Sequence, residues 1–507
     1  MRFPVPDRLN FTHVAIFASL VFIGQTLDGT DFLFAVLTAS YILLWATAFN
    51  VAGGITYASG AFIFFNGLLD VVIGFTYKIF LGQPGERNLL APIATMFCYC
   101  VGMIAMLVAA FVCRGLRPER GLLRGFDSLR EMKSGAIVCL FGGVVVTTIV
   151  TIGGGSTNLV ITGLRQINIM PQMAVLLATT YEVLHSGGNR AINWIVVVGV
   201  SFLFVAGLMS FSKEGMLVGF VAWFIAAAFQ GYNFPKRHLV GGLLAFAFFN
   251  YYLVPYSQYV RNFKATTFVE NEAIALHYLM DLGETRRLYV EGIAEYDIKN
   301  EFHFFDQREG FMDRLLVIPE DDGLIHYTNQ GNVFGLAPTV VAYANIVPRF
   351  IWRNKPTFGN DYAHELGLLA DEDLTTGIEF SPTADAYHQA KWLGLLLLLP
   401  IDMFLYFIIT DSIVGSQKWS PWALIPILDT SKIAAAGGLD APVYAIIYGL
   451  FGILTMVWFI KHAAPFVLRV FRQPDFGALD IPLQPVTTSG ISPTPRLQSN
   501  PGRESSQ

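Results

Sequence analysis

Long runs of apolar residues alternate with short polar links over most of the chain. A run of about 17 to 25 apolar residues is long enough to cross the hydrocarbon core of a bilayer as a helix. Such runs predict spanning helices near residues 11–27, 32–50, 59–77, 90–113, 136–153, 191–211, 215–231, 238–257, 391–410 and 441–461. Two weaker apolar segments, near 168–186 and 419–436, are candidates for two more.

Basic residues in the links predict the orientation, because short links rich in Lys and Arg stay in the cytoplasm. The clearest basic link is 114–133, and the links around Lys236 and after Lys461 carry the same signal. Because these basic links lie on the same side of the membrane, the number of crossings between one link and the next must be even. This requires both weaker segments to cross. We therefore expect an all-α integral membrane protein of about twelve transmembrane helices, with both termini in the cytoplasm.

One link is far longer than the others. Residues 257–390 separate an N-terminal bundle of about nine helices, 1–256, from the C-terminal helices at 391–461, and are expected to form an extracytoplasmic loop domain. Within this acidic loop, the apolar stretch 333–348 is too short to span comfortably and predicts a helix at the interface or beneath the loop. The tail at 473–507, rich in Pro, Ser, Thr and Gly, is expected to be disordered in the cytoplasm.

Composition agrees with a membrane protein. The chain has 507 residues, of which 54% are hydrophobic and only 14% charged, and soluble globular proteins do not share this bias. The net charge of -5, without a basic arm, argues against nucleic acid as a partner. The cysteines lie in or at the ends of apolar runs, so they fit neither a disulfide framework nor a spaced metal site.

Three cations stand among bulky apolar residues in VPRFIWRNKP, namely Arg349, Arg353 and Lys355. No Asp or Glu occurs from Gly323 to Asn360, so they have no ion-pair partner nearby in the sequence. Guanidinium forks match phosphate oxygens and Lys adds a compact charge, which predicts a site for a pyrophosphate carried on a lipid. Contact with anionic head groups, or pairing with distant acids of the loop, is the alternative.

Candidate acid-base residues follow in the same loop. Glu379, Asp385 and His388 precede the helix that re-enters the membrane, and His364 is a second imidazole candidate. General-base catalysis of group transfer requires a carboxylate or imidazole within reach of the acceptor hydroxyl. Taken singly, each of these residues is more often an ordinary surface side chain.

Polar residues inside the predicted helices either line a cavity or bond helix to helix. Asn66, Asp70 and Asp402 are examples. Two further cations, Lys213 in the link SFSKEG and Arg261 after the helix at 238–257, are predicted on the same extracytoplasmic face as Arg349.

Motifs of nucleotide and metal chemistry are missing from the sequence. It contains no Gly-rich phosphate loop, no HExxH, no CxxC and no GxSxG. The acids at 371–373 have the spacing seen in metal-dependent glycosyltransferases, but such a match arises readily by chance in an acidic loop. We expect no metal and no cofactor.

Residues 308–394 resemble the Wzy-type O-antigen or oligosaccharide repeat-unit polymerases, which are related in architecture to the O-antigen ligases. The resemblance rests on the run from REGFMDRLL to PRFIWRNKP, on the SFSKEG link and on the short apolar helix after the long loop. The layout of about a dozen helices with one large late loop is also similar. The first two hundred residues match by topology only.

The resemblance implies a GT-C-type fold and a metal-independent glycosyltransferase of the bacterial inner membrane, with its large loop in the periplasm. Such an enzyme moves a growing glycan from undecaprenyl pyrophosphate onto the next lipid-linked repeat unit, for O-antigen, capsule or exopolysaccharide. Its implied partners are the lipid-linked donor and acceptor and membrane lipids, with a chain-length regulator as a further candidate. The pyrophosphate is then expected on basic residues, which are Arg349, Arg353, Lys355, Arg314, Arg308 and Lys213, with Arg261 nearby.

The chain differs from the family pattern at two positions, and two other functions share features with this one. The family often shows Glu before an aromatic residue, where this chain has Asp385 and Tyr387, and often Arg where this chain has Lys213. An O-antigen ligase would share most of these features. A non-enzymatic transporter or flippase of lipid-linked glycans would share the basic loops, although flippases usually show an internal repeat that this sequence lacks.

Overall fold

The structure of the protein, a computed structural model, consists of helices joined by turns. It describes residues 1–3, 5–123, 125–126, 128–153, 159–263, 268–297, 304–306, 312, 315–347, 352, 354, 366 and 380–470. The helices are α1 (Phe11–Leu27), α2 (Phe32–Ala52), α3 (Ala58–Gly67), α4 (Ile73–Leu81), α5 (Pro92–Leu116), α6 (Leu129–Ile152), α7 (Leu159–Gln166), α8 (Met170–His185), α9 (Trp194–Met209), α10 (Lys213–Phe229), α11 (Lys236–Phe248), α12 (Val254–Arg261), α13 (Phe268–Met280), α14 (Leu282–Asp297), α15 (Ile318–Asn329), α16 (Ala337–Ala344), α18 (Pro382–Leu393), α19 (Leu399–Val414), α20 (Leu424–Ala436), α21 (Ala441–Tyr444) and α22 (Phe451–Val470). The prediction of an all-α protein is confirmed for these residues, which form no sheet.

Seven helices in this part of the chain are long and apolar enough to cross a membrane. They are Phe32–Ala52, Ala58–Leu81, Pro92–Leu116, Leu129–Ile152, Lys236–Arg261, Pro382–Val414 and Ala441–Ala463. Two shorter apolar helices, α1 and α9, match further predicted spans. A multi-pass membrane protein is therefore confirmed, while the count of twelve crossings stays a prediction.

The two weak segments form helices, but short ones. α8 has 16 residues and α20 has 13. At 1.5 Å per residue α20 is about 20 Å long, less than the ~30 Å of a hydrocarbon core. α8 packs among α6, α9 and α10, and α20 packs against α3. Whether either helix crosses the membrane completely stays a prediction.

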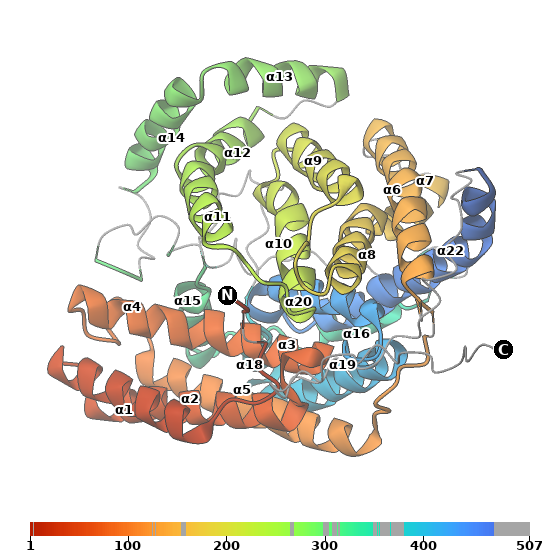
Figure 1. Cartoon of the computed structure of the whole chain (residues 1–507). Coiled ribbons are helices and arrows are strands. Elements are labelled where there is room, and N and C mark those ends of the chain that lie inside the picture. Colours follow the sequence, from red (N-terminus) through yellow and green to blue (C-terminus); the bar gives the residue numbers. More distant parts are fainter. Residues whose placement is uncertain are drawn as a thin grey trace, which may run out of the picture.

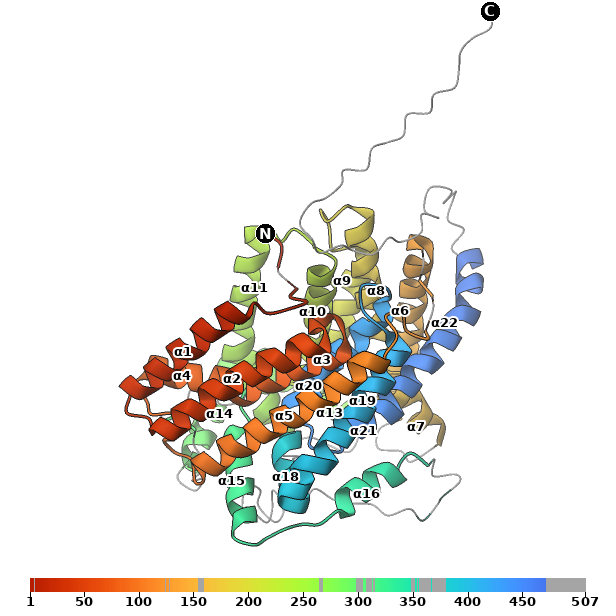
Figure 2. The ribbon, with the colours of Figure 1, turned by 90° about the horizontal axis from the view of Figure 1, so that it is seen from below.

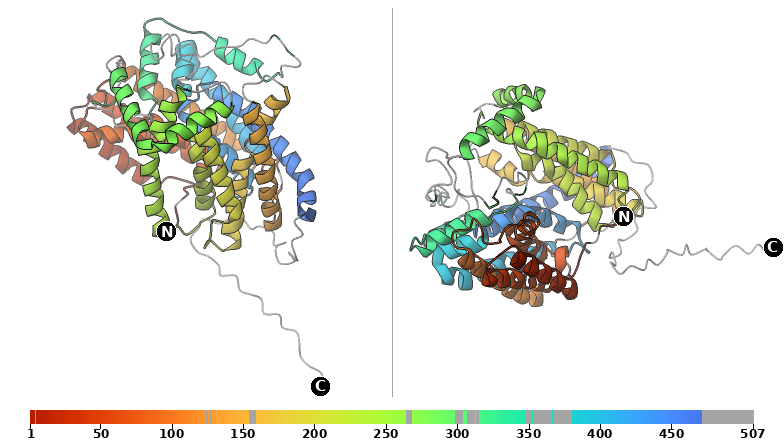
Figure 3. Two further views of the ribbon diagram at one scale, coloured as in Figure 1. Left: turned by 90° about the horizontal axis from the view of Figure 1, so that it is seen from above. Right: turned by 90° about the vertical axis from the view of Figure 1, so that its left-hand side faces the viewer.

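The helices gather into two bundles, each with its own apolar core (Figure 1). The first bundle contains α1 to α5 with α15, α18 and α19 around buried rings such as Phe49 and Phe407. The second contains α6, α8, α9, α10 and α22 around residues such as Leu176 and Met456. The right-hand view of Figure 3 shows the two bundles side by side, with part of the C-terminal segment (blue) between them. α20 joins the bundles, because it packs on α3 and its first residues lie in the second core.

The residues predicted as one loop domain pack in two places. α13 and α14 contact α12, whereas α15 contributes Ile318 and Leu324 to the core of the first bundle and packs against α5 and α18. The stretch 333–348 contains the eight-residue helix α16, which fits the predicted short helix. Figure 2 shows α15, α16 and α18 at the end of the molecule opposite the N-terminus. The domain limits drawn from the sequence stay a prediction.

Candidate functional site

The segment predicted to re-enter the membrane is a helix with one break. α18 begins after Ser381, whose Oγ accepts a hydrogen bond from the backbone N of Ala384 at 3.1 Å. The backbone leaves helical geometry at Ala390 (φ -150°, ψ 24°) and Lys391 (φ 50°, ψ -132°). A positive φ at a residue other than glycine is strained, so the surrounding packing must hold this break in place.

The break takes two backbone carbonyl groups of α18 out of the helical hydrogen-bond pattern, and the segment before α16 donates hydrogen bonds to them. The N–H of Phe334 donates to the carbonyl of His388 at 3.1 Å, and the N–H of Gly335 donates to that of Gln389 at 3.1 Å. Buried carbonyls require partners. The broken turn of α18 therefore docks the segment that leads into α16.

Two glycines allow α18 to approach its neighbours closely. A Cβ at Gly102 of α5 would stand 2.5 Å from Oγ1 of Thr383. A Cβ at Gly394 would stand only 1.7 Å from the carbonyl oxygen of Ala386, because the chain folds back on itself after the break. Only glycine fits at position 394.

Gly394→Ala is expected to displace residues 382–389 and to lower the melting temperature of the purified protein. Overpacking of this kind costs about 1–3 kcal/mol. Gly241→Ala in α11 is the matched control, because nothing lies within 4 Å of an added Cβ there. Thermal unfolding in detergent measures both variants, and equal melting temperatures for Gly394→Ala and wild type would contradict the fold-back.

Asp385 lies on the buried turn of α18 rather than in solvent. It is 5% exposed, and its Oδ1 accepts a hydrogen bond from Nε2 of Gln389 at 3.1 Å. Its Oδ2 accepts from the backbone N–H of Leu439, in the turn between α20 and α21, at 2.8 Å. A Cβ at Gly438 would stand 3.0 Å from both Asp385 Oδ2 and Asp440 Oδ1, so the two carboxyl groups are close neighbours.

Asp440 is the more accessible member of this acid pair, being half-buried. Burial, and then the charge of Asp385, raise the pKa of Asp440 to about 6. A carboxyl group with a pKa in this range exchanges protons near neutral pH, as general bases do. In the sequence Asp440 stands in GGLDAP and looks like an ordinary turn residue, so no signal singled it out.

His388 points away from the acid pair and toward α15. It is 1% exposed, and its ring lies beside those of Tyr327 and Phe334. Its Nδ1 lies 2.8 Å from Oγ1 of Thr328. That hydroxyl donates to the carbonyl of Leu324 at 2.7 Å and so accepts from Nδ1. These contacts are typical of a structural histidine.

Two acids of α15, which the sequence did not single out, fix the helices around the site. Asp321 accepts hydrogen bonds from the hydroxyl of Tyr99 at 2.7 Å and the backbone N–H of Ser381 at 2.9 Å. Burial raises the pKa of Asp321 to about 7, although both hydrogen bonds oppose the shift. Asp322 accepts from Oγ1 of Thr95 at 2.6 Å and from backbone N–H groups at the start of α5. α15 thereby holds α5 and α18 together.

α16 is bonded to three elements of the membrane bundle. The hydroxyl of Thr339 donates to Oε1 of Gln389 on α18 at 2.6 Å. The hydroxyl of Tyr343 donates to Asp402, which is 3% exposed in the first turn of α19. Just after the helix, Nδ2 of Asn345 donates to the hydroxyl of Tyr444 at 3.1 Å.

Asn66 and Asp70 serve a bond between helices. Asp70 lies in a π turn, Leu68–Val72, and its Oδ2 accepts from Nδ2 of Asn66 at 2.6 Å. The same Nδ2 donates to the carbonyl of Ala434 in α20 at 2.8 Å. This pair therefore fits the helix-to-helix interpretation better than a cavity lining.

Two of the predicted cations, Lys213 and Arg261, lie away from the region around Asp385. Lys213 begins α10, and Arg261 ends α12 with an exposed side chain. The link before Lys213 meets α12 where Phe211 packs on Tyr256, in a different apolar cluster from the one around Asp385.

The other predicted site residues lie outside the residues that the structure describes, and their roles stay predictions. They are Arg308, Arg314, Arg349, Arg353, Lys355, His364 and Glu379, together with the acids at 371–373.

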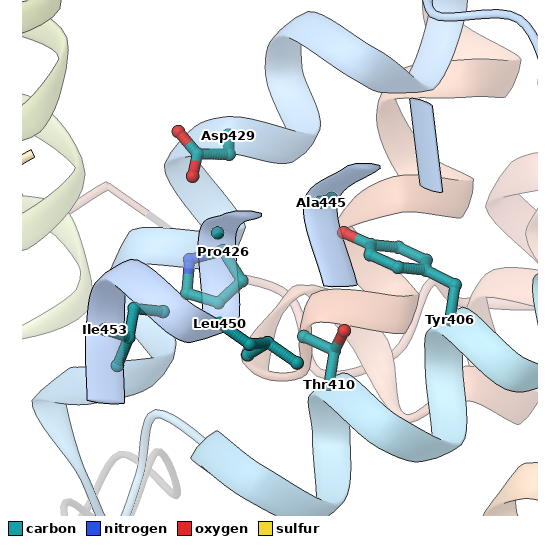
Figure 4. A pocket seen from close by; sticks show the side chains of 8 residues that line it. Tyr406, Thr410, Pro426, Asp429, Ala445, Leu450 and Ile453 are labelled. Atoms are coloured by element: carbon teal, nitrogen blue, oxygen red, sulfur yellow. The ribbon is translucent and has the colours of Figure 1, made fainter. Parts of the chain in front are cut away.

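A small cavity lies between α19, α20 and the start of α22, beside Tyr406, Thr410 and Asp429 (Figure 4). About 20 Å³ is open to the centre of a water molecule, which is room for about one water. This cavity is far too small for a lipid-linked sugar.

Over the ranges that the structure describes, no three His, Cys, Asp or Glu side chains gather closely enough to hold a metal ion.

Comparisons of the chain with family models, with curated proteins and with solved structures found no match.

Proposed function

We propose that the protein is a membrane glycosyltransferase that polymerises lipid-linked oligosaccharide repeat units for a bacterial cell-surface polysaccharide. The donor would be a glycan on undecaprenyl pyrophosphate, and the acceptor the next lipid-linked unit. The protein would lie in the inner membrane, with α15, α16 and α18 on the extracytoplasmic side. This orientation agrees with the opposite placement of the N-terminus and these helices in Figure 2.

The observation that carries the proposal is the bridge made by α16. At its start, Thr339 is linked through Gln389 to Asp385, and Asp440 lies beside that carboxylate. At its end, the chain continues two residues beyond Val347 to Arg349 and then to Arg353 and Lys355. One short helix thus connects a carboxylate pair suited to activate a hydroxyl with a cationic segment suited to hold a pyrophosphate.

The chemistry follows from these two parts. The acceptor hydroxyl attacks the anomeric carbon of the donor glycan and its proton passes to a carboxylate, while the bond from that carbon to the pyrophosphate oxygen breaks. Negative charge develops on the departing lipid pyrophosphate, and preorganised cations in a site of low dielectric stabilise it. Holding both lipid-linked reactants at one interface supplies the orientation. No nucleotide is required, because the donor is already activated.

Among the general-base candidates from the sequence and from the structure, Asp440 is the best supported. His388 and Asp385 are almost completely buried and hydrogen-bonded within the fold, whereas Asp440 is half-buried beside Asp385. Asp385 would then act behind Asp440, since its negative charge makes the neighbouring carboxylate more basic.

The value of kcat/KM should rise with pH through about 6, because only the ionised Asp440 accepts a proton and its pKa is about 6. Asp440→Asn should lower the rate by about 10²–10⁴-fold and remove this dependence. Rates from pH 5 to pH 8 with lipid-linked substrate measure both effects. Glu291→Gln, an exposed acid on α14, is the control. A full rate in Asp440→Asn would return the role to Asp385, His388, Glu379 or His364.

A deletion strain separates the proposed polymerase from its rivals. Loss of a polymerase should leave single lipid-linked repeat units on the outer leaflet of the membrane. Retention of single units on the inner leaflet would instead identify a flippase, and accumulation of long lipid-linked chains would identify a ligase.

A further inference from the structure

We propose that α13 lies in the extracytoplasmic surface of the membrane, with an exposed apolar stripe inserted among the lipid head groups and the first part of the acyl chains. The stripe consists of Val269, Ala273, Leu276 and Met280. This contact with lipid is independent of the proposed function, because it uses no residue of the candidate site.

The four residues of the stripe lie on one face of α13. They follow one another at intervals of four, three and four residues, which is the spacing of neighbours along a helix face. Val269 is 74% exposed, Leu276 52% and Met280 86%. Ala273 between them is exposed as well. A row of exposed apolar side chains marks a surface that contacts lipid or another apolar partner.

The opposite face of α13 packs on the ends of two membrane helices. Ala275 is 0% exposed, in an apolar cluster that includes Tyr256 of α12. The ring of Tyr278 stacks on that of Phe263, just after α12, with the ring centroids 5.6 Å apart and an angle of 23° between the planes. α13 also contacts α9. The helix therefore has two apolar faces, one packed on the protein and one exposed.

The exposed face continues a surface that meets lipid. The span Lys236–Arg261 is apolar, yet only 22% of its apolar stretch is buried inside the protein. Phe263 follows this span and is 45% exposed, so the apolar surface extends from the span to α13. Figure 1 shows α13 at the edge of the molecule. The left-hand view of Figure 3 shows it, in green, lying crosswise to α11, as a helix in the plane of the membrane surface would.

A tyrosine and an arginine indicate the level of the lipid head groups beside this helix. Tyr251, toward the end of the span, is 50% exposed, and the guanidinium of Arg286 on α14 lies 3.9 Å from the centre of its ring. Exposed tyrosine rings and long cationic side chains gather where the membrane meets water. Only Asp281 separates α13 from α14, so both helices are held near this level.

The charges of α13 favour apolar insertion over attraction to anionic lipid. The helix, Phe268–Met280, contains no Lys or Arg, and its two acids are Glu270 and Glu272. Anionic head groups would repel these carboxylates, whereas insertion of the stripe depends on buried apolar area and is little affected by salt. The surface therefore fits a membrane of any charge.

Nitroxide labels on single introduced cysteines test this contact in full-length protein in lipid nanodiscs, without substrate. Labels at Leu276→Cys and Met280→Cys should collide with oxygen, which concentrates in the bilayer, more often than with a water-soluble nickel chelate. Leu243→Cys on α11, where the leucine is 69% exposed, is the control for lipid and should give the same order. Glu291→Cys on α14, where the side chain is 61% exposed, is the control for water and should give the reverse order.

The four native cysteines are buried, so the label reacts at the introduced positions. Raising the salt concentration should leave the order of collisions at Leu276→Cys and Met280→Cys unchanged. More frequent collisions with the nickel chelate at both positions would overturn the proposal, because the stripe would then face water. Rare collisions with both reagents would also overturn it, since a protein partner or a second copy of the chain would then cover the stripe.

Discussion

Arg349→Ala and Arg353→Ala should each abolish long-chain glycan while the protein still accumulates in the membrane. Removing one preorganised group that stabilises transition-state charge typically costs about 10²–10³-fold in rate. Glycan length on gels and the amount of protein in the membrane fraction measure the two parts of this result. Arg237→Ala, an exposed arginine in the predicted cytoplasmic link, is the control and should leave chain length unchanged.

The matching lysine variants separate a pyrophosphate site from simple attraction to anionic lipids. Lysine keeps the positive charge but loses the two-pronged donor geometry of arginine. We therefore expect Arg349→Lys and Arg353→Lys to retain only part of the activity. Full activity in both lysine variants would favour head-group contact, and normal chain lengths in both alanine variants would remove the assignment of these residues.

Arg117→Met or Asp411→Leu should destabilise the protein by about 3–5 kcal/mol, because each leaves an unpaired charge inside the fold. Nη1 of Arg117 lies 2.8 Å from Oδ2 of Asp411, and the two side chains are 7% and 0% exposed. The Arg117 guanidinium also stacks 3.6 Å above the ring of Tyr57, and Asp411 accepts from the hydroxyl of Ser59 at 2.6 Å. The pair thus joins α5 to α19 and to the start of α3.

The double variant Arg117→Met/Asp411→Leu tests this interpretation of the pair. It removes both charges, so it should be clearly more stable than either single variant. Unfolding of the purified protein in detergent measures all four forms. If the double variant lost the sum of the two single losses, Arg117 and Asp411 would be acting independently.

The membrane bundle could be predicted from the sequence because run length and polarity are local properties. The break at Ala390 and Lys391 could not, because no proline marks it and its cause is packing at Gly394 and the docking of Phe334 and Gly335. The burial of α15 was missed for a related reason. Its sequence, IPEDDGLIHYTN, reads as a polar surface helix until Tyr99 and Ser381 supply partners for Asp321.

The candidate site was predictable in part. The sequence indicated Asp385 and His388 in the segment that re-enters the membrane. It could not predict their partners, because Asp385 bonds to Leu439 before α21 and His388 to Thr328 on α15, and both partners are distant in the chain. Asp440 and Asp411 carry no local signal, since each owes its setting to residues far away in the chain. The cations at 349–355 remain an inference from charge pattern and chain continuity.

Turnover of a defined lipid-linked repeat unit by the purified protein in liposomes tests the central claim most directly. Without nucleotide sugar or added metal, we predict products of two or more repeat units together with free undecaprenyl pyrophosphate, and no such products from Arg349→Ala. Recovery of only the single unit, chemically unchanged, would contradict polymerisation, and its movement across the bilayer would identify a transporter instead.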